Sequence, residues 1–124
     1  MSLKITKNTL SIKMHADAKY NSDLMMELSI VIAARWYWEQ QGKSLYKSFK
    51  KEFKNKKIKM CDPNIGKVMM YDRYKKLSNL KKLLKYFDGK TDKQIMDIPF
   101  DDKNVSLYDK HIEGLFALRK SMWI

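Results

Sequence analysis

Hydrophobic and polar residues first alternate and then follow a helical spacing along this chain. Leu10, Ile12 and Met14 alternate with polar neighbours, which is the period of a half-buried strand near residues 9–15. A long apolar stretch follows over 24–38, and a helix is predicted from Asn21 or Ser22 to about Gln41, with Gly42 as its C′ residue. This helix is apolar on almost every side, so we expect its own domain or a partner to bury it.

The next segment combines an aromatic stripe with many lysines. Leu45, Phe49 and Phe53 recur every four residues after Ser44, which predicts a second helix whose apolar stripe packs on the first. Its lysines must then point outward. A short strand is expected near residues 57–60, before the turn residues of 62–66.

Three further helices are indicated in the second half. Tyr74, Leu77, Leu80, Leu84 and Phe87 form a helical stripe that ends at residues 88–89, and residues 68–71 fit either a strand or the lead into that helix. Thr91 and Gln94 have capping-box spacing for a short helix before Pro99. A last helix is expected from about Ser106, with an apolar face that includes Tyr108, Ile112, Leu115, Phe116, Met122 and Trp123.

These elements predict a mainly α fold, a compact helical domain of four or five helices with one or two short β-strands. At 124 residues, one domain is the expectation for residues 1–124. It would comprise a strand and buried helix (1–42), a basic segment (43–90) and C-terminal helices (91–124).

Charge changes the picture, because the net +12 is concentrated in the middle of the chain. Residues 43–90 hold sixteen basic and four acidic side chains, whereas the flanking segments are close to neutral. Such a block attracts polyanions. Twelve of its lysines are predicted to contact phosphate: Lys47, Lys50, Lys51, Lys54, Lys56, Lys57, Lys59, Lys75, Lys76, Lys81, Lys82 and Lys85.

The type of cation indicates how a nucleic acid, DNA or RNA, would be bound. Of the 26 basic residues only Arg35, Arg73 and Arg119 are arginine. Because lysine acts mainly as a point charge, this composition favours backbone contact over base reading. The alternatives are a solvated lysine face that keeps the protein soluble, or the coding bias of an AT-rich genome.

One segment resembles a known DNA-binding family. Residues 89–95, with Gly89, Thr91 and Ile95, are similar to the start of the second helix in bacterial helix-turn-helix regulators. His111-Ile112, with Leu115 and Leu118 after it, is placed like the recognition helix of the LuxR-type version. The connection 99–103 is longer than the usual turn and lacks its glycine, so an ordinary helical subdomain is the alternative.

Enzyme chemistry finds little support, and we expect no enzyme, no cofactor and no metal. Cys61, His15 and His111 are the only cysteine and histidines and none are close in sequence, which disfavours zinc. The runs 52–54 and 101–103, beside Asp97, contain carboxylates and lysine that could hold Mg²⁺. A metal-dependent nuclease is therefore the third hypothesis.

Partners and location complete the expectations. Trp36, Tyr37 and Trp38 are consecutive, cannot all face one core, and are candidates for a homodimer or protein interface. A single cysteine and an N-terminus without a signal-peptide core favour the cytoplasm, and we expect no membrane partner. The leading function is nucleic-acid binding, as in a small phage-type regulator. The alternative is a protein-binding inhibitor or adaptor that targets a nucleic-acid-handling complex.

Overall fold

The computed structural model describes residues 2–5, 10–13 and 22–122, and its mainly α class confirms the sequence-based prediction. Two strands, β1 (Ser2–Ile5) and β2 (Leu10–Lys13), form an antiparallel pair in which Ile5 faces Leu10. The helical elements are α1 (Ser22–Tyr37), the π-helical turn η2 (Trp38–Gly42), α2 (Lys43–Phe53), α3 (Ile65–Phe87), α4 (Asp92–Asp97), the 3₁₀ turn η3 (Ile98–Phe100) and α5 (Val105–Met122).

Short strands were expected at two places, with different outcomes. Strand β2 lies inside the range 9–15, although Met14, His15 and Asn21 fall outside the described residues. The strand near 57–60 is wrong, because residues 56–59 form an irregular loop. Asn55 ends α2 in a left-handed conformation (φ 62°), and no described strand lies beside the lysine-rich run that follows it.

The predicted break at Gly42 is also wrong, since α1, η2 and α2 form one continuous helical segment. Gly42 is helical (φ −61°, ψ −43°), and the amide of Lys43 donates to the Trp38 carbonyl. A Cβ at Gly42 would lie 3.0 Å from Trp38 Cε3 and 3.1 Å from Tyr37 Cε1. Glycine is therefore needed for close approach of two rings, not for the positive φ of a helix end.

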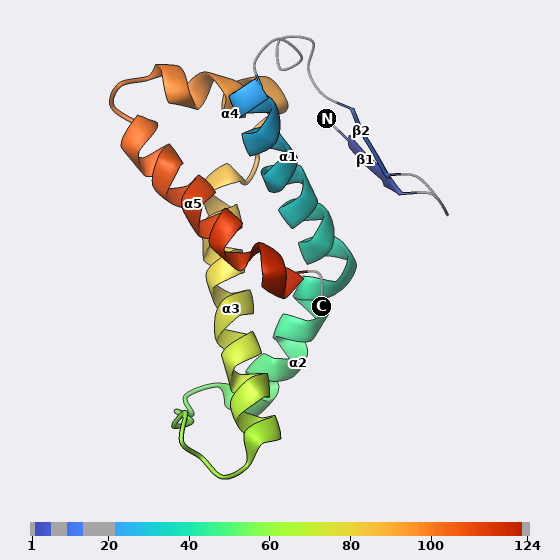
Figure 1. Cartoon of the computed structure of the whole chain (residues 1–124), viewed down its shortest axis with the longest axis vertical. Coiled ribbons are helices and arrows are strands. Elements are labelled where there is room, and N and C mark those ends of the chain that lie inside the picture. The colour runs from blue at the N-terminus through green and yellow to red at the C-terminus, as the bar shows by residue number, and fades with distance from the viewer. Residues whose placement is uncertain (1, 6–9, 14–21, 123–124) are drawn as a thin grey trace.

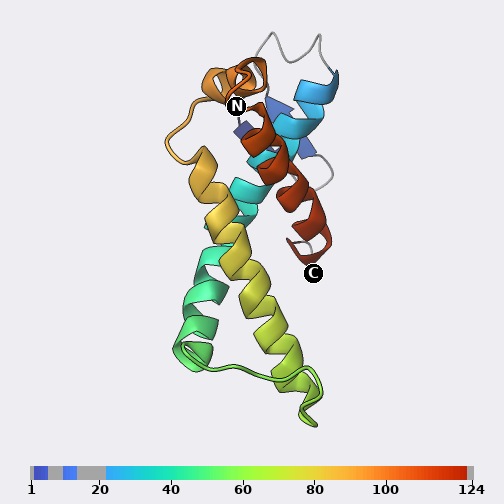
Figure 2. The ribbon, with the colours of Figure 1, turned by 90° about the vertical axis from the view of Figure 1, so that its left-hand side faces the viewer.

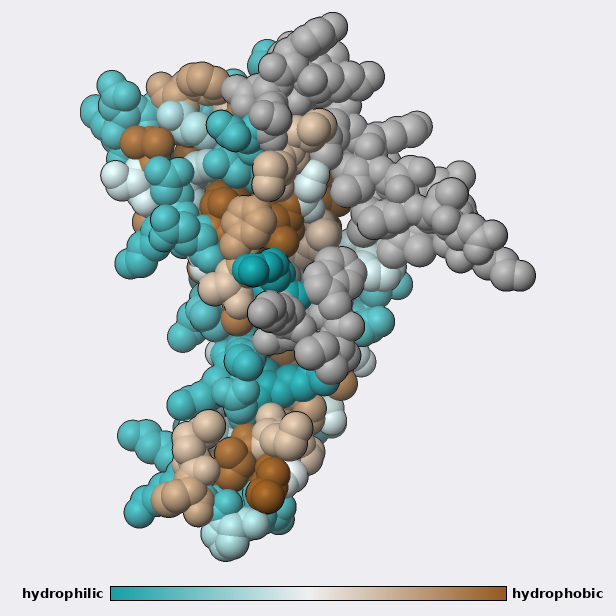
Figure 3. Space-filling model, in the orientation of Figure 1, coloured by the Kyte–Doolittle hydropathy of each residue, from teal (hydrophilic) through white to brown (hydrophobic). Residues whose placement is uncertain are grey.

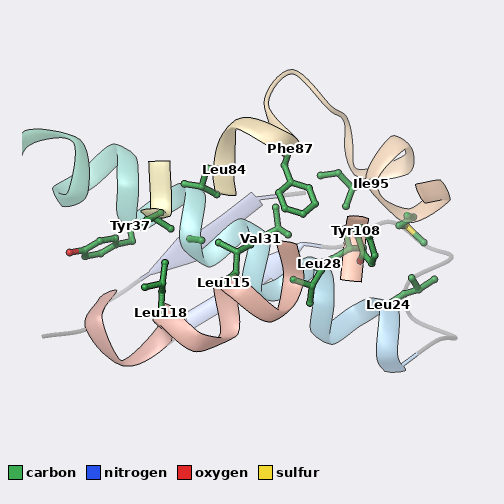
Figure 4. Close-up of a cluster of buried hydrophobic side chains, with 14 of the residues drawn as sticks. Leu24, Leu28, Val31, Tyr37, Leu84, Phe87, Ile95, Tyr108, Leu115 and Leu118 are labelled. Atoms are coloured by element: carbon green, nitrogen blue, oxygen red, sulfur yellow. The ribbon is translucent and has the colours of Figure 1, made fainter. Parts of the chain in front are cut away.

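The core lies where α1, the second half of α3 and α5 pack together. Figure 4 shows Leu28, Val31, Phe87 and Leu115 from these three helices converging. The Tyr108 hydroxyl on α5 donates to Glu27 Oε2 on α1 at 2.7 Å. The apolar face predicted for α5 is buried at Tyr108, Ile112 and Leu115, while Trp123 lies outside the described residues.

Helix ends in the second half follow the sequence signals. Asn64 caps α3 by accepting the Lys67 amide at 3.1 Å, so residues 68–71 belong to this helix. Gly89 has φ +70° just after α3, as expected of a C′ glycine. Both hydrogen bonds of the capping box between Thr91 and Gln94 are present, which confirms that prediction.

A helical hairpin of α2 and the first half of α3 extends away from this core (Figures 1 and 2). The aromatic stripe of α2 packs on α3, not on α1 as the spacing suggested, because η2 redirects the chain. Tyr46 stacks on Tyr74 with centroids 5.8 Å apart, and Phe53 meets the edge of Tyr71 at 5.7 Å. The hairpin therefore has its own aromatic interior, and its lysines are left on the outside.

Candidate functional site

The lysines of α2 form a stripe along the hairpin. Lys43, Lys47, Lys50 and Lys54 recur at spacings of four, three and four residues, which places them on one side of a helix. All are exposed except Lys50, which is half-buried. Lys51 is exposed and flanks this stripe, four residues after Lys47 and three before Lys54. We refer to Lys43, Lys47, Lys50 and Lys54 as the α2 stripe.

A second stripe follows α3. Lys75, Lys82 and Lys85 recur with Ser78 at three- and four-residue spacing, and Lys81 lies beside them. We refer to Lys75, Lys81, Lys82 and Lys85 as the α3 stripe. Lys76 does not belong to it, because its Nζ pairs with Asp72 Oδ2 at 3.0 Å. Among the described residues this is the one ion pair formed by the twelve predicted lysines.

The two stripes meet at the ring of Tyr46. Lys50 Nζ from α2 lies 5.8 Å from the ring centroid, and Lys81 Nζ from α3 lies 4.9 Å from it. The ring is fixed by stacking on Tyr74 and by a tilted contact with Trp38 at 5.7 Å. Two predicted lysines from separate helices thus share one rigid aromatic platform.

A cleft of about 600 Å³ opens beside this platform. Its walls come from α1, η2, α2 and α3 and carry four cations and two carboxylates. The lining residues are Arg35, Glu39, Tyr46, Ser78, Lys81, Lys82, Leu84, Lys85 and Asp88. The excess of positive charge makes the cleft attractive to an anion such as a phosphate.

Arg35 holds one wall of the cleft in place. Its guanidinium donates to the carbonyl of Phe87, the last residue of α3, and at 3.4 Å to that of Lys90 in the turn that follows. The interaction ties α1 to α3 and places a cation at the negative end of the α3 dipole. Sequence reasoning missed Arg35, Glu39 and Asp88 as site residues. The one basic residue of a largely apolar helix was the available signal.

The remaining predicted lysines lie farther along the hairpin. Lys56, Lys57 and Lys59 are all exposed in the loop between α2 and α3. Lys75 Nζ lies 5.1 Å from the ring centroid of Tyr71. The structure thus brings the α2 and α3 stripes together at Tyr46, with Lys51 flanking the α2 stripe, while Lys76 is paired with Asp72 outside this arrangement.

The aromatic triplet divides between the core and a half-buried position. Tyr37 is 1% exposed, so its place in a partner interface is corrected: it is a core residue. Trp36 and Trp38 are half-buried against the core cluster, and Trp38 also contacts Tyr46. Their role in an interface stays a prediction.

Candidate catalytic groups do not gather in the described part of the chain. It contains no group of three or more His, Cys, Asp or Glu side chains that could hold a metal ion. Asp101 caps its own turn by accepting from the Lys103 amide and the Asn104 side chain. Cys61 is exposed in the loop, Glu52 is exposed on α2, and His15 lies outside the described residues.

His111 is held in a small cluster between α3 and α5. Its ring stacks on Tyr86 at 4.0 Å, and its Nδ1 donates to the Leu107 carbonyl at 2.7 Å. Burial, and secondarily the charge of Asp101, raises the pKa of the Tyr86 hydroxyl. The segment likened to a helix-turn-helix connects α4 to α5 through η3 and a turn at 101–104, and α5 packs on α1 and α3.

Comparison with protein-family models, curated proteins and solved structures gives no match. Within the described residues, no helix has the length and apolar character needed to cross a membrane.

Proposed function

We propose that this protein binds nucleic acid by phosphate contact through the α2 and α3 stripes. The observation that carries the proposal is the approach of Lys50 and Lys81 to the same Tyr46 ring, beside a cleft lined by Lys82 and Lys85. A polyanion laid across this point would meet cations from both helices at once. Lysine without arginine in the stripes favours the backbone over base edges.

The dimensions of the stripes suit a run of several phosphates. Lys43 to Lys54 spans eleven residues of helix, or about 16 Å, and Lys75 to Lys85 spans about 15 Å. At ~3.4 Å per base pair this is about five base pairs. If six or more of the eight stripe lysines meet phosphates, affinity falls by about 10³ or more between ~50 and ~200 mM salt.

A charge-matched pair of triple variants tests the proposal. Lys47→Glu/Lys50→Glu/Lys54→Glu reverses most of the α2 stripe. Lys93→Glu/Lys103→Glu/Lys110→Glu makes the same change in net charge at exposed positions off both stripes. Each phosphate contact is worth about a factor of ten at ~0.1 M salt, so the stripe variant should bind about a thousandfold more weakly.

Mobility shifts with double-stranded DNA, single-stranded DNA and RNA at two salt concentrations provide the measurement. We expect the control variant to retain most of its affinity, and the salt slope to flatten only in the stripe variant. Equal losses in the two variants, or a flat salt response of the wild type, would refute the proposed surface. A stoichiometric protein partner that survives ~0.5 M salt would favour the inhibitor or adaptor instead.

The finer expectations belong to the same proposal. A small phage-type regulator and a cytoplasmic location rest on the sequence pattern alone. A homodimer through Trp36 and Trp38 is supported also by the half-buried state of the two indoles. Sedimentation of the purified protein at several concentrations tests the dimer.

A further inference from the structure

The free end of the α2–α3 hairpin carries apolar side chains in water. Met60 is 73% exposed, Ile65 71% and Met69 67%. They belong to the loop and to the first turns of α3, which Figures 1 and 2 place at one end of the long axis of the molecule. Figure 3 shows hydrophobic side chains gathered at this end, with hydrophilic ones around them. We call residues 54–70 the hairpin tip.

The exposed apolar side chains of α3 at the tip belong to a helix start that is fixed by hydrogen bonds. The Asn64 side chain accepts the Lys67 amide at 3.1 Å, and the Asn64 amide donates to Asp62 Oδ1 at 2.9 Å. With α3 fixed in this way, Ile65 and Met69 lie four residues apart on the same helix face. That face points away from the aromatic interior of the hairpin, in which Tyr71 is buried.

The tip is also strongly basic. It holds five exposed lysines, Lys54, Lys56, Lys57, Lys59 and Lys67, against one carboxylate, Asp62. A second copy of the chain would present the same positive charge, so pairing of two tips is opposed by repulsion. The surface that complements the tip must be negatively charged and must also accept apolar side chains.

The negatively charged surface could be an anionic bilayer or an acidic protein, and the residue types of the tip favour the bilayer. Protein interfaces are enriched in aromatic residues, methionine and arginine and are depleted in lysine. The tip has methionine, but it also has five lysines and neither an aromatic residue nor an arginine. Lysine stems suit a bilayer surface, because the chain lies along apolar groups while the ammonium stays at the headgroups.

We propose that the hairpin tip binds the surface of membranes that contain anionic lipids. Met60, Ile65 and Met69 enter the boundary between headgroups and acyl chains, and the tip lysines contact lipid phosphates. An apolar insertion together with a basic cluster supplies the two signals that stable surface binding needs. The expectation of no membrane partner rested on the lack of a spanning segment, and surface binding needs none. The inference does not depend on the nucleic-acid proposal.

Cys61, the single cysteine of the chain, provides a reporter inside the tip. Labelled with an environment-sensitive fluorophore, it should show a blue-shifted emission when the full chain meets vesicles of phosphatidylcholine and phosphatidylglycerol (7:3). Vesicles of phosphatidylcholine alone should give little shift, since each lysine near an anionic surface contributes about a fivefold factor. Vesicle flotation measures the affinity without the label.

Two variants separate the tip from exposed hydrophobic residues in general. Ile65→Ser/Met69→Ser should reduce vesicle affinity by about a hundredfold, from the loss of two inserted side chains. Met26→Ser/Phe100→Ser is the control, because these residues are 60% and 73% exposed on elements away from the tip. It should bind vesicles like the wild type. Both variants change exposed positions, and circular dichroism verifies their folding.

Several results would overturn the proposal. Wild-type protein that does not float with the anionic vesicles at ~0.1 M salt would contradict it. If the wild type and Ile65→Ser/Met69→Ser bound the vesicles equally, the net charge of the protein and not the apolar tip would account for the vesicle binding. If this variant kept its vesicle affinity and lost nucleic-acid affinity, the tip would belong to the nucleic-acid surface. Retained nucleic-acid binding with lost vesicle binding supports a separate lipid-binding tip.

Discussion

Replacing Gly42 by alanine should destabilise the protein, although the same change usually stabilises a helix. Gly42 is helical and lies in η2, between α1 and α2. Its missing Cβ leaves room for two rings, with Trp38 Cε3 at 3.0 Å and Tyr37 Cε1 at 3.1 Å from the position that a Cβ would take. Tyr37 is 1% exposed and enclosed by the core, so its ring has little room to move.

The magnitude follows from two opposing effects. Alanine is favoured over glycine in a helix by about 1 kcal/mol, which would stabilise the variant. Forcing a methyl group into a packed site costs about 1–3 kcal/mol. The net expectation for Gly42→Ala is a loss of up to about 2 kcal/mol in the free energy of unfolding.

Gly66→Ala provides the matched control. Gly66 is also in a helix and has no positive φ, but its Cβ would meet only Asn64 Oδ1 at an ordinary 3.5 Å. We expect it to gain up to about 1 kcal/mol from reduced freedom of the unfolded chain.

Urea and thermal unfolding of the two variants measure the difference. It should be about 1–3 kcal/mol, or thermal midpoints about 4–12 °C apart for a domain of this size. If Gly42→Ala raised the midpoint as much as Gly66→Ala, the close approach of the two rings would not be what requires glycine.

Three further changes test contacts that fix the helices. Tyr108→Phe removes the hydrogen bond to Glu27 and should cost about 1.5–3 kcal/mol in urea unfolding at pH 7. Burial, and after it the Glu27 carboxylate, raises the pKa of the Tyr108 hydroxyl above its ordinary 10.0. As the pH rises, the unfolded chain therefore loses this proton before the folded chain does. The free energy of unfolding of the wild type should fall above pH 10 more steeply than that of Tyr108→Phe. Gly89→Ala should lower the free energy of unfolding by about 1–2 kcal/mol, and Gly89→Asn by less, because φ is +70° at this position. A Cβ would touch nothing within 4 Å, so the cost comes from the backbone alone. Thermal midpoints of the two variants measure both values. Thr91→Ala should cost about 0.5–2 kcal/mol by removing the cap of α4, whereas Thr91→Ser should keep most of it.

The sequence predicted helices well where apolar spacing and cap residues agreed. The stripe from Tyr74 to Phe87 and the Gly89 stop define most of α3 correctly. Gly42 was misread because glycine has two separate uses in helical structure. At Gly89 it supplies a positive φ, and at Gly42 it supplies space for two rings from the preceding turn. Only the three-dimensional packing of Tyr37 and Trp38 distinguishes these uses.

The candidate site was predictable only within single helices. The α2 stripe follows from four- and three-residue spacing and needs no tertiary information. The meeting of Lys50 and Lys81 at Tyr46 depends on the turn of η2, which brings α2 alongside α3. For the same reason the pattern could not show that Arg35 reaches the end of α3 to form a wall of the cleft.

The way in which the lysines are accommodated bears on what they can bind. Crowding cations along one hairpin destabilises a fold through their mutual repulsion. In the described residues, Lys50 and Lys81 lie over Tyr46, Lys75 over Tyr71 and Lys90 over Tyr86, at 4.9–5.8 Å from the ring centroids.

Each of these ring contacts contributes about 0.5–1 kcal/mol and leaves the charge of the ammonium intact. A carboxylate partner, such as Asp72 beside Lys76, offsets repulsion by cancelling charge. Tyrosine rings thus relieve part of the strain of a basic surface while its positive potential stays directed at solvent. That combination suits the proposed binding of a partner that supplies the negative charge.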